Sequence, residues 1–280
     1  MSSAVALAVL FAAFCHASWN AIVRMRGDKI VAITLVVTGA GLPAIPLLFF
    51  FPFPPAAAWP YVIASAIIHV GYNTALAMSY HHGELTRVYP LLRGSAPLTT
   101  LVVSLLFLDE AVEPGEIAGI VVLALGIMTL TLEGGWRVLV ASPQAVLYAA
   151  ATSLCITAYT LCDGLGARLA DSAHQYVAWL FVLDMLPMLA GVLLVKRLAF
   201  AAALATDWRA GLAGGLLSLV AYWIAIWAMT VAPIPIVAAL RETSILFALF
   251  IGMIWLGERV TPIRAASIAL VLAGLALMRL

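Results

Sequence analysis

Charged side chains stand inside long apolar stretches of the sequence at four positions: Arg93, Asp184, Arg241 and Glu242. A charge at the centre of a bilayer costs about 2.5–3.5 kcal/mol on insertion scales, so each of them must face protein or water. The guanidinium fork of arginine binds a carboxylate or phosphate through two hydrogen bonds. We therefore expect Arg93 and Arg241 to bind an anionic group of a ligand. The alternative is a structural role, in which each arginine stabilises kinked backbone; at Arg93 the helix is disturbed by Pro90 and Pro97.

The two carboxylates of this set, Asp184 and Glu242, could neutralise an arginine, or take up a proton and couple the protein to a proton gradient. For Asp184, which precedes Pro187, a structural ion pair is the favoured interpretation. Glu242 follows Arg241 directly, and neighbours on a helix do not face each other. Its partner must therefore come from another segment, and coupling and pairing both stay open.

Aromatic and polar side chains recur at helical spacing in several of the apolar stretches. His16, Trp19 and Asn20, for example, share one face of a helix. Such clusters could stack against a ring or enclose an ammonium group. The alternative is an ordinary structural role, since tryptophan and tyrosine are enriched at membrane interfaces. The candidate binding residues of this kind are His16, Trp19, Asn20, Tyr72, Asn73, Tyr159, Tyr222, Trp223 and Trp227.

The composition excludes most other classes of protein. Hydrophobic residues make up 65% of the chain, charged residues 10%, and the mean hydropathy is +1.12, which no soluble domain of this length sustains. The net charge of +1 gives no indication of a nucleic-acid partner. The sequence has no HExxH or GxSxG motif and no cysteine or histidine spacing typical of a metal site. We expect an integral membrane protein that is not an enzyme and needs no cofactor or metal.

Apolar runs long enough to cross a hydrocarbon core of about 30 Å can be counted directly. They predict an all-α membrane protein with ten transmembrane helices, at Ala4–Val23, Ile30–Phe51, Ala58–Tyr80, Leu85–Leu108, Gly115–Leu132, Gln144–Cys162, His174–Val195, Ala210–Met229, Ile234–Leu256 and Ile263–Leu280.

The end of each half of the chain repeats the other. Tyr89–Leu132 aligns without a gap on Val237–Leu280, and the identical pairs include Arg93/Arg241, Glu110/Glu258, Pro114/Pro262 and Gly126/Gly274. A repeat of this length indicates that a unit of five helices was duplicated. We place the first five-helix repeat at residues 1–138 and the second at 139–280, within one transmembrane unit that has a central cavity.

The basic residues predict the orientation. Ten of the 14 lysines and arginines lie in or beside the segments that follow the first, third, fifth, seventh and ninth helices. Because cytoplasmic loops carry the excess of positive charge, we expect both termini to lie outside the cytoplasm, in a bacterial inner membrane. Five is an odd number, so the second repeat would be inverted relative to the first. Secondary transporters use inverted repeats to build one site with two alternating entrances.

The turn motifs carry a more specific resemblance. The sequences LLFLDEAVEP and IWLGERVTP close the fourth helix of each half, and GIVVLALGI and SIALVLAGL open the fifth. With ten helices as five plus five, the chain resembles the EamA-type members of the drug/metabolite transporter superfamily. The resemblance implies a cavity lined by the first, third, fourth, sixth, eighth and ninth helices, with the fifth and tenth at the periphery. It departs from the repeat at Asp109, where the second half has Gly257.

Together these features predict a secondary transporter that moves a small metabolite, such as an amino acid or another carboxylate, by alternating access, with export or facilitated diffusion favoured. One alternative is an aromatic-cage carrier of an organic or quaternary-ammonium cation, and another is a non-transporting membrane scaffold. The expected partners are the small-molecule substrate, the lipid bilayer and, if transport is coupled, protons. Both a monomer and a homodimer are compatible with the sequence.

Overall fold

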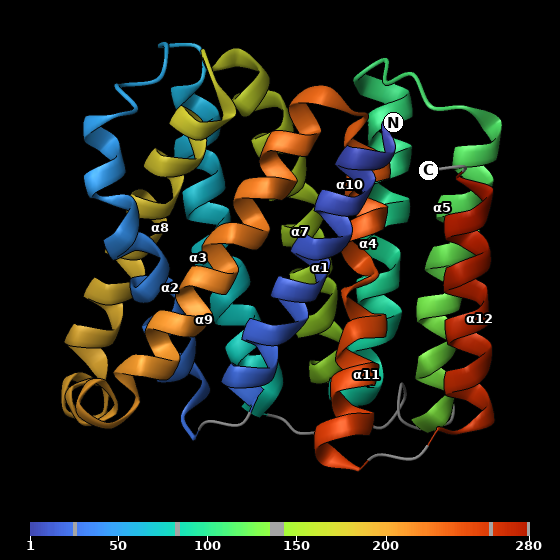
Figure 1. Cartoon of the computed structure of the whole chain (residues 1–280). Coiled ribbons are helices and arrows are strands. Elements are labelled where there is room, and N and C mark those ends of the chain that lie inside the picture. The colour runs from blue at the N-terminus through green and yellow to red at the C-terminus, as the bar shows by residue number, and fades with distance from the viewer. Residues whose placement is uncertain (25–26, 82–84, 135–142, 258–259, 279–280) are drawn as a thin grey trace.

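A computed structural model describes residues 1–24, 27–81, 85–134, 143–257 and 260–278 (Figure 1). The described residues are helical and contain no strand. The helices are α1 (Ser3–Arg24), α2 (Lys29–Ala44), η1 (Pro46–Phe49), α3 (Trp59–His81), α4 (Leu85–Phe107), α5 (Pro114–Thr129), η2 (Leu130–Gly134), α7 (Pro143–Leu169), α8 (Ala173–Val195), α9 (Arg197–Val231), α10 (Ile234–Glu242), α11 (Ser244–Leu256) and α12 (Pro262–Leu277).

Eight helical segments are long and apolar enough to span a membrane. The remaining two of the ten predicted spans correspond to shorter apolar helices, Arg93–Phe107 and Pro262–Leu277. The all-helical membrane fold is therefore confirmed, whereas the count of ten spans stays a prediction.

Four predicted spans differ clearly from the helices that form. The second, Ile30–Phe51, is divided into α2, which ends at Ala44, and η1. The sixth, Gln144–Cys162, is longer in the structure because α7 continues to Leu169. The eighth, Ala210–Met229, begins too late, since α9 begins at Arg197. Polar residues in the first part of α9 interrupt the apolar pattern of the sequence but do not interrupt the helix. The ninth, Ile234–Leu256, is broken into α10 and α11 at Thr243, whose hydroxyl donates to the Leu240 carbonyl at 2.6 Å.

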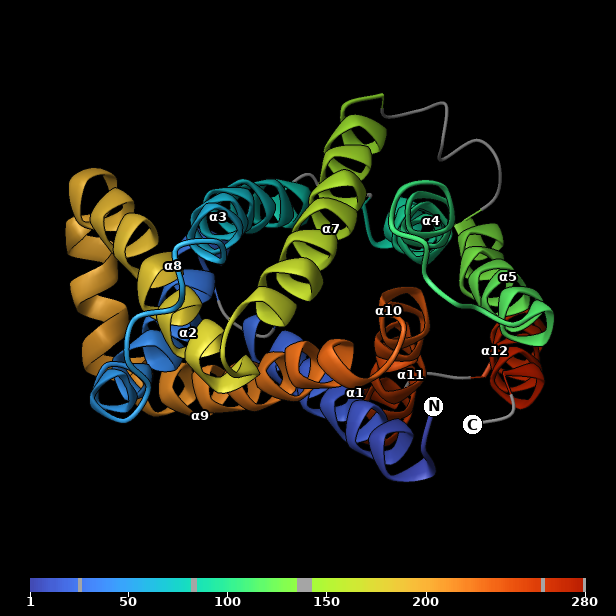
Figure 2. The ribbon, with the colours of Figure 1, turned by 90° about the horizontal axis from the view of Figure 1, so that it is seen from above.

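The helices α5 and α12 lie side by side at one edge of the bundle (Figures 1 and 2). Their backbones approach closely because Gly119 faces Gly274: a Cβ on Gly274 would lie 2.7 Å from the Gly119 carbonyl oxygen. Seven residues further along α5, Ser267 donates to the Gly126 carbonyl at 2.6 Å. In the repeat, Gly126 is equivalent to Gly274, and Gly119 to Ser267. The two contacts are thus related by a two-fold axis across antiparallel helices, which supports the proposal that the repeats are inverted.

The turn after α4 explains why the repeat has Asp109 in one half and Gly257 in the other. Both residues have a left-handed backbone, with φ of 48° and 64° respectively. Glycine adopts this conformation without steric cost, and aspartate is among the few other residues that tolerate it at a helix end. The substitution therefore preserves the turn.

The four salt bridges among the described residues all join the first half of the chain to the second. Arg168 pairs with Glu110 at 2.6 Å and also donates to the carbonyls of Met229 and Ala232 at the end of α9. Lys196 pairs with Asp28 at the opposite end of the bundle, where α8 ends and α2 begins (Figure 1). Ion pairs between the halves therefore lie at both ends of the bundle.

We predict that Gly274→Leu weakens the packing of α5 against α12. The added side chain would meet backbone atoms of Gly119 and Leu123, and such overpacking costs about 1–3 kcal/mol. Thermal unfolding in detergent should show a melting temperature several degrees below that of the wild type. The matched control is Gly191→Leu, in α8, where a Cβ meets nothing within 4 Å. Equal melting temperatures for the two variants would contradict a close contact at Gly274.

Candidate substrate site

A cavity lies inside the bundle and is lined from seven helices. Its residues are His16 and Trp19 (α1), Ile33, Val36, Val37 and Ala40 (α2), His69, Tyr72 and Asn73 (α3), Tyr159 (α7), Leu180, Phe181 and Asp184 (α8), Ser218 and Tyr222 (α9), and Arg241 (α10). The cavity brings together residues far apart in the sequence, and half of them are residues that the sequence predicted for the site: His16, Trp19, Tyr72, Asn73, Tyr159, Asp184, Tyr222 and Arg241. Its volume is about 60 Å³, so the side chains around it must move before a metabolite fits.

The composition of this wall corrects two expectations. The second and seventh predicted helices, α2 and α8, line the cavity, although the family resemblance did not include them. The fourth helix, α4, was expected there, but none of its side chains that the structure describes lines the cavity. The fifth and tenth, α5 and α12, lie at the edge of the bundle as expected (Figure 2).

Arg241 is the cationic residue of the cavity. Its guanidinium carbon lies 4.8 Å from the centroid of the Tyr222 ring, within the range of a cation–π contact. No salt bridge to Arg241 is formed by the part of the chain that the structure describes. α10 ends at Glu242, so Arg241 stands in its last turn, inside the bundle.

Asp163 holds the ring that Arg241 contacts. This carboxylate is fully buried and accepts hydrogen bonds from the hydroxyls of Tyr222 and Tyr176, the latter at 3.0 Å. Asp163 was not among the predicted site residues, because it aligns with Asn20 only at an uncertain offset. His69 was also missed; its ring stacks on Tyr159 at 4.2 Å, and its spacing from Tyr72 and Asn73 was the available signal.

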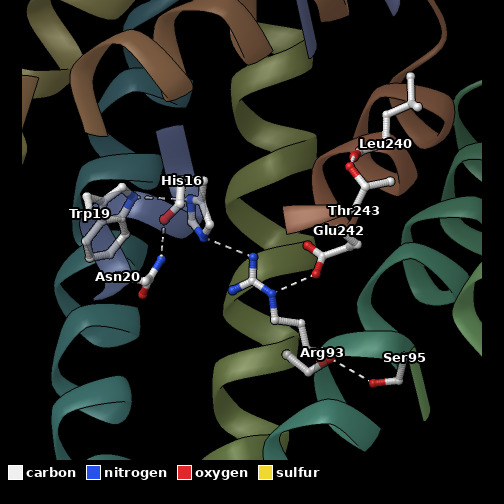
Figure 3. Close-up of polar contacts among 9 residues, drawn as sticks. His16, Trp19, Asn20, Arg93, Ser95, Leu240, Glu242 and Thr243 are labelled. Carbon is white, nitrogen blue, oxygen red and sulfur yellow. Dashed lines mark hydrogen bonds and ion pairs between the residues drawn. The ribbon is translucent and has the colours of Figure 1, made fainter. Parts of the chain in front are cut away.

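Arg93, the repeat equivalent of Arg241, is in a different environment (Figure 3). Its Nε donates to Oε2 of Glu242 at 2.7 Å, and both side chains are buried. The partner that Glu242 needed from another segment is thus Arg93. Arg93 does not line the cavity, and its predicted contact with a substrate anion stays a prediction.

His16 connects this ion pair to the cavity (Figure 3). Nη2 of Arg93 lies 3.0 Å from Nε2 of His16, while the Trp19 indole N–H donates to Nδ1 at 3.3 Å and the Asn20 amide donates to the His16 carbonyl at 2.9 Å. Arginine and tryptophan are donors only, and a neutral imidazole has one acceptor nitrogen. A neutral His16 can therefore accept a hydrogen bond from Arg93 or from Trp19, but not from both at once. Its acceptor role can switch between these two donors.

Like Arg93, three other predicted binding residues are not among the lining residues of the cavity: Asn20, Trp223 and Trp227. The Trp223 indole donates to Nδ1 of His174 at 2.7 Å, beside Phe51, in a separate aromatic cluster. Trp227 packs, partly buried, against the hydrophobic core. Their predicted contact with a substrate stays a prediction.

Comparison with known proteins identifies the family. A model of the EamA-like transporter family matches the chain twice, at residues 3–132 and 143–280. The chain belongs to the EamA-like transporter family. This family is part of the drug/metabolite transporter superfamily, as the turn motifs indicated. The protein is accordingly a multi-pass membrane transporter built from two EamA repeats.

A solved structure, titled only "Crystal structure of protein", has the same fold as this EamA-like chain. The two share 15% sequence identity, with a TM-score of 0.78, over 99% of this chain and 96% of the other. No curated protein matches the chain in a sequence search. The comparisons thus establish the family and the fold and leave the substrate to be argued from the cavity.

We predict that the buried pair of this EamA-like protein responds to mutation as a unit. Arg93→Gln or Glu242→Gln alone removes one member of this buried pair, which costs about 3–5 kcal/mol. The double variant Arg93→Gln/Glu242→Gln should regain most of that stability, as measured by thermal unfolding of the purified proteins in detergent. If the two single effects simply add in the double variant, the pair is not coupled.

Proposed function

We propose that this transporter carries a small metabolite with a carboxylate group by alternating access, and that Arg241 binds the carboxylate. One observation carries the proposal: Arg241 faces the cavity without an ion-pair partner among the described residues, whereas Arg93 is neutralised by Glu242. An uncompensated arginine inside a membrane protein is costly, so its retention favours a role with an anion. The aromatic residues of α3, α7 and α9 then enclose the remainder of the substrate.

The repeat explains why only one of the two arginines is available. The position equivalent to Glu242 in the first half is Gly94, which carries no charge. A Cβ on Gly94 would lie 2.9 Å from the Ala124 carbonyl oxygen, so the close packing of α4 against α5 excludes a side chain there. The symmetry-related partner of Arg241 is therefore missing, and a substrate carboxylate could supply it.

The proposed movement is a rocking of the two halves around this site. Cross-half ion pairs lie at both ends of the bundle, and breaking those at one end while keeping those at the other would expose the cavity to one side only. We propose export or facilitated diffusion from the cytoplasmic side of a bacterial inner membrane, with both termini outside the cytoplasm. In this scheme Glu242 serves to neutralise Arg93 rather than to carry protons.

The second candidate is a carrier of an organic cation. The Tyr159 ring makes edge-to-face contacts with the rings of Tyr72, at 5.5 Å between centroids, and Tyr222, at 5.9 Å, and this arrangement resembles the wall of an aromatic cage. The Tyr222 ring already faces the Arg241 guanidinium, however, so a substrate cation would meet a like charge there. The carboxylate proposal is favoured for this reason.

We predict that Arg241→Gln abolishes carboxylate binding and leaves the fold intact. A ligand that binds the native state raises the free energy of unfolding by about 2.7 kcal/mol at a concentration of 100 Kd, and the melting temperature rises with it. Amino acids and small carboxylates should therefore stabilise the purified wild type and fail to stabilise Arg241→Gln.

The matched control for this experiment is Arg93→Gln/Glu242→Gln, which also removes a buried arginine but keeps Arg241. It should respond to carboxylates as the wild type does. Stabilisation of wild type and Arg241→Gln alike by quaternary amines, with no response to carboxylates, would favour the cation carrier instead.

A further inference from the structure

The helix α9 is longer than a membrane span requires. Its 35 residues extend about 52 Å, whereas the hydrocarbon core of a bilayer is about 30 Å thick. The first turns of α9 cross the end of the bundle where α8 ends and α2 begins. They are seen end-on at the lower left of Figure 1 and lengthwise at the left edge of Figure 2. We call residues 197–209 the crossing segment; it lies in the plane of the membrane surface.

The outer side of the crossing segment is apolar. Leu198 is 86% exposed, and Leu204 and Trp208 are each 48% exposed. Among residues 197–209, all of which the structure describes, Phe200 alone is buried, in a small cluster with residues of α2 and α8. Leucine and tryptophan on the exposed side of a helix that lies in the membrane plane are typical of helices that insert into the boundary between headgroups and acyl chains.

The crossing segment also carries positive charge that the described residues do not neutralise. Arg197 and Arg209 are exposed, and neither forms a salt bridge with a residue that the structure describes. Lys196 and Arg264, in contrast, are paired with carboxylates. The guanidinium carbon of Arg209 lies 5.4 Å from the centroid of the Trp208 ring. Basic side chains beside an apolar helix surface are the pattern that attracts anionic lipids.

A groove of about 310 Å³ separates the crossing segment from the neighbouring parts of α1 and α2. Small side chains form its wall on α9: Ala199, Ala202, Ala203, Ala210 and Gly211. Apolar side chains form most of the opposite wall, among them Ile22, Val31 and Leu35. The polar residues of the lining are Asp28, Thr206 and Asp207. Because apolar walls offer water few hydrogen bonds, the groove is suited to a hydrocarbon chain.

We propose that the crossing segment binds an anionic phospholipid, with the phosphate group at Arg209 and one acyl chain in the groove. Ala202, Thr206 and Arg209 are spaced by four and three residues, so they share one side of the helix. This spacing places Arg209 at the rim of the groove that Ala202 and Thr206 line. A guanidinium can donate two hydrogen bonds to one phosphate. The proposal does not depend on the substrate of the central cavity.

The bound lipid would act on the arrangement of the two halves. The groove takes one wall from α1 and α2, in the first half of the chain, and the other from α9, in the second. An acyl chain between these walls would contact both halves at the end of the bundle where Lys196 pairs with Asp28. The lipid should therefore stabilise the folded protein, and this stabilisation can be measured.

The experiment compares two phospholipids that have the same oleoyl chains, phosphatidylglycerol and phosphatidylcholine, on the purified full-length protein in detergent. Bound lipid is counted by native mass spectrometry, and stability is followed by thermal unfolding. The wild type should bind phosphatidylglycerol at least about fivefold more tightly, because each basic residue near an anionic lipid contributes about 1 kcal/mol. Inorganic phosphate, which has no acyl chain, should not raise the melting temperature.

The variant Arg209→Gln tests the headgroup contact. It removes an exposed charge, so the melting temperature without lipid should equal that of the wild type. The preference for phosphatidylglycerol over phosphatidylcholine should fall about fivefold. Arg264→Gln, at the start of α12, removes one positive charge away from the groove and is the matched control. It should keep the full preference.

The variant Ala202→Phe tests the groove. Ala202 is exposed and lines the groove, so a phenyl ring there would occupy the space of the acyl chain. Binding of both phospholipids should weaken severalfold. Ala205→Phe is the matched control, since Ala205 is exposed on the same segment but does not line the groove. Each variant is compared with its own melting temperature in the absence of lipid.

Three results would overturn the proposal. If the wild type binds the two phospholipids equally, or if Arg209→Gln keeps the preference, Arg209 does not bind the headgroup. If Ala202→Phe and Ala205→Phe bind lipid equally well, the groove holds no acyl chain. If inorganic phosphate stabilises the wild type as strongly as phosphatidylglycerol does, the ligand is a soluble anion and the lipid assignment is wrong.

Discussion

The structure depends on one constraint, that a charge buried in hydrocarbon must find an opposite charge or a ligand. The Arg93–Glu242 pair satisfies this constraint inside the protein, and it does so across the boundary between the two repeats. The remaining described salt bridges also cross that boundary, at the ends of the bundle. These ion pairs add to the packing of helices between the halves, such as α2 against α9 and α5 against α12. Any movement of one half against the other must break some of these pairs and keep the rest.

The fold was largely predictable, because transmembrane helices appear in a sequence as long apolar runs and a duplicated unit appears as repeated turn motifs. The left-handed turn at Asp109 and Gly257, for example, kept its place in both halves although the residue changed. The break at Thr243 was not predictable, since no proline or glycine marks it. The early start of α9 was missed for the opposite reason: Asp207 and Arg209 lower the local hydropathy, although charged residues are compatible with a helix.

The candidate site was predictable in its residue types and not in its pairings. A single sequence indicates that Arg93, Arg241, Asp184 and Glu242 are too costly to be solitary, but partners lie on other helices and depend on their rotation. The distinction between a neutralised arginine and an available one came only with the contact between α4 and α10. The apolar lining residues of α2 and α8 were missed because they carry no chemical signature, although Asp184 of α8 was singled out by its charge.

The absence of a side chain at Gly94 has a consequence for how such a protein can evolve. In a homodimer of two identical halves, both equivalent positions would carry the same residue. Either both arginines would then be neutralised or neither would. Once the halves are fused in one chain, each can mutate alone. The arginine of one half can then pair with a carboxylate of the other half, while the second arginine remains available to bind a ligand. Fusion thereby permits a division of labour that a symmetric pair of subunits cannot reach.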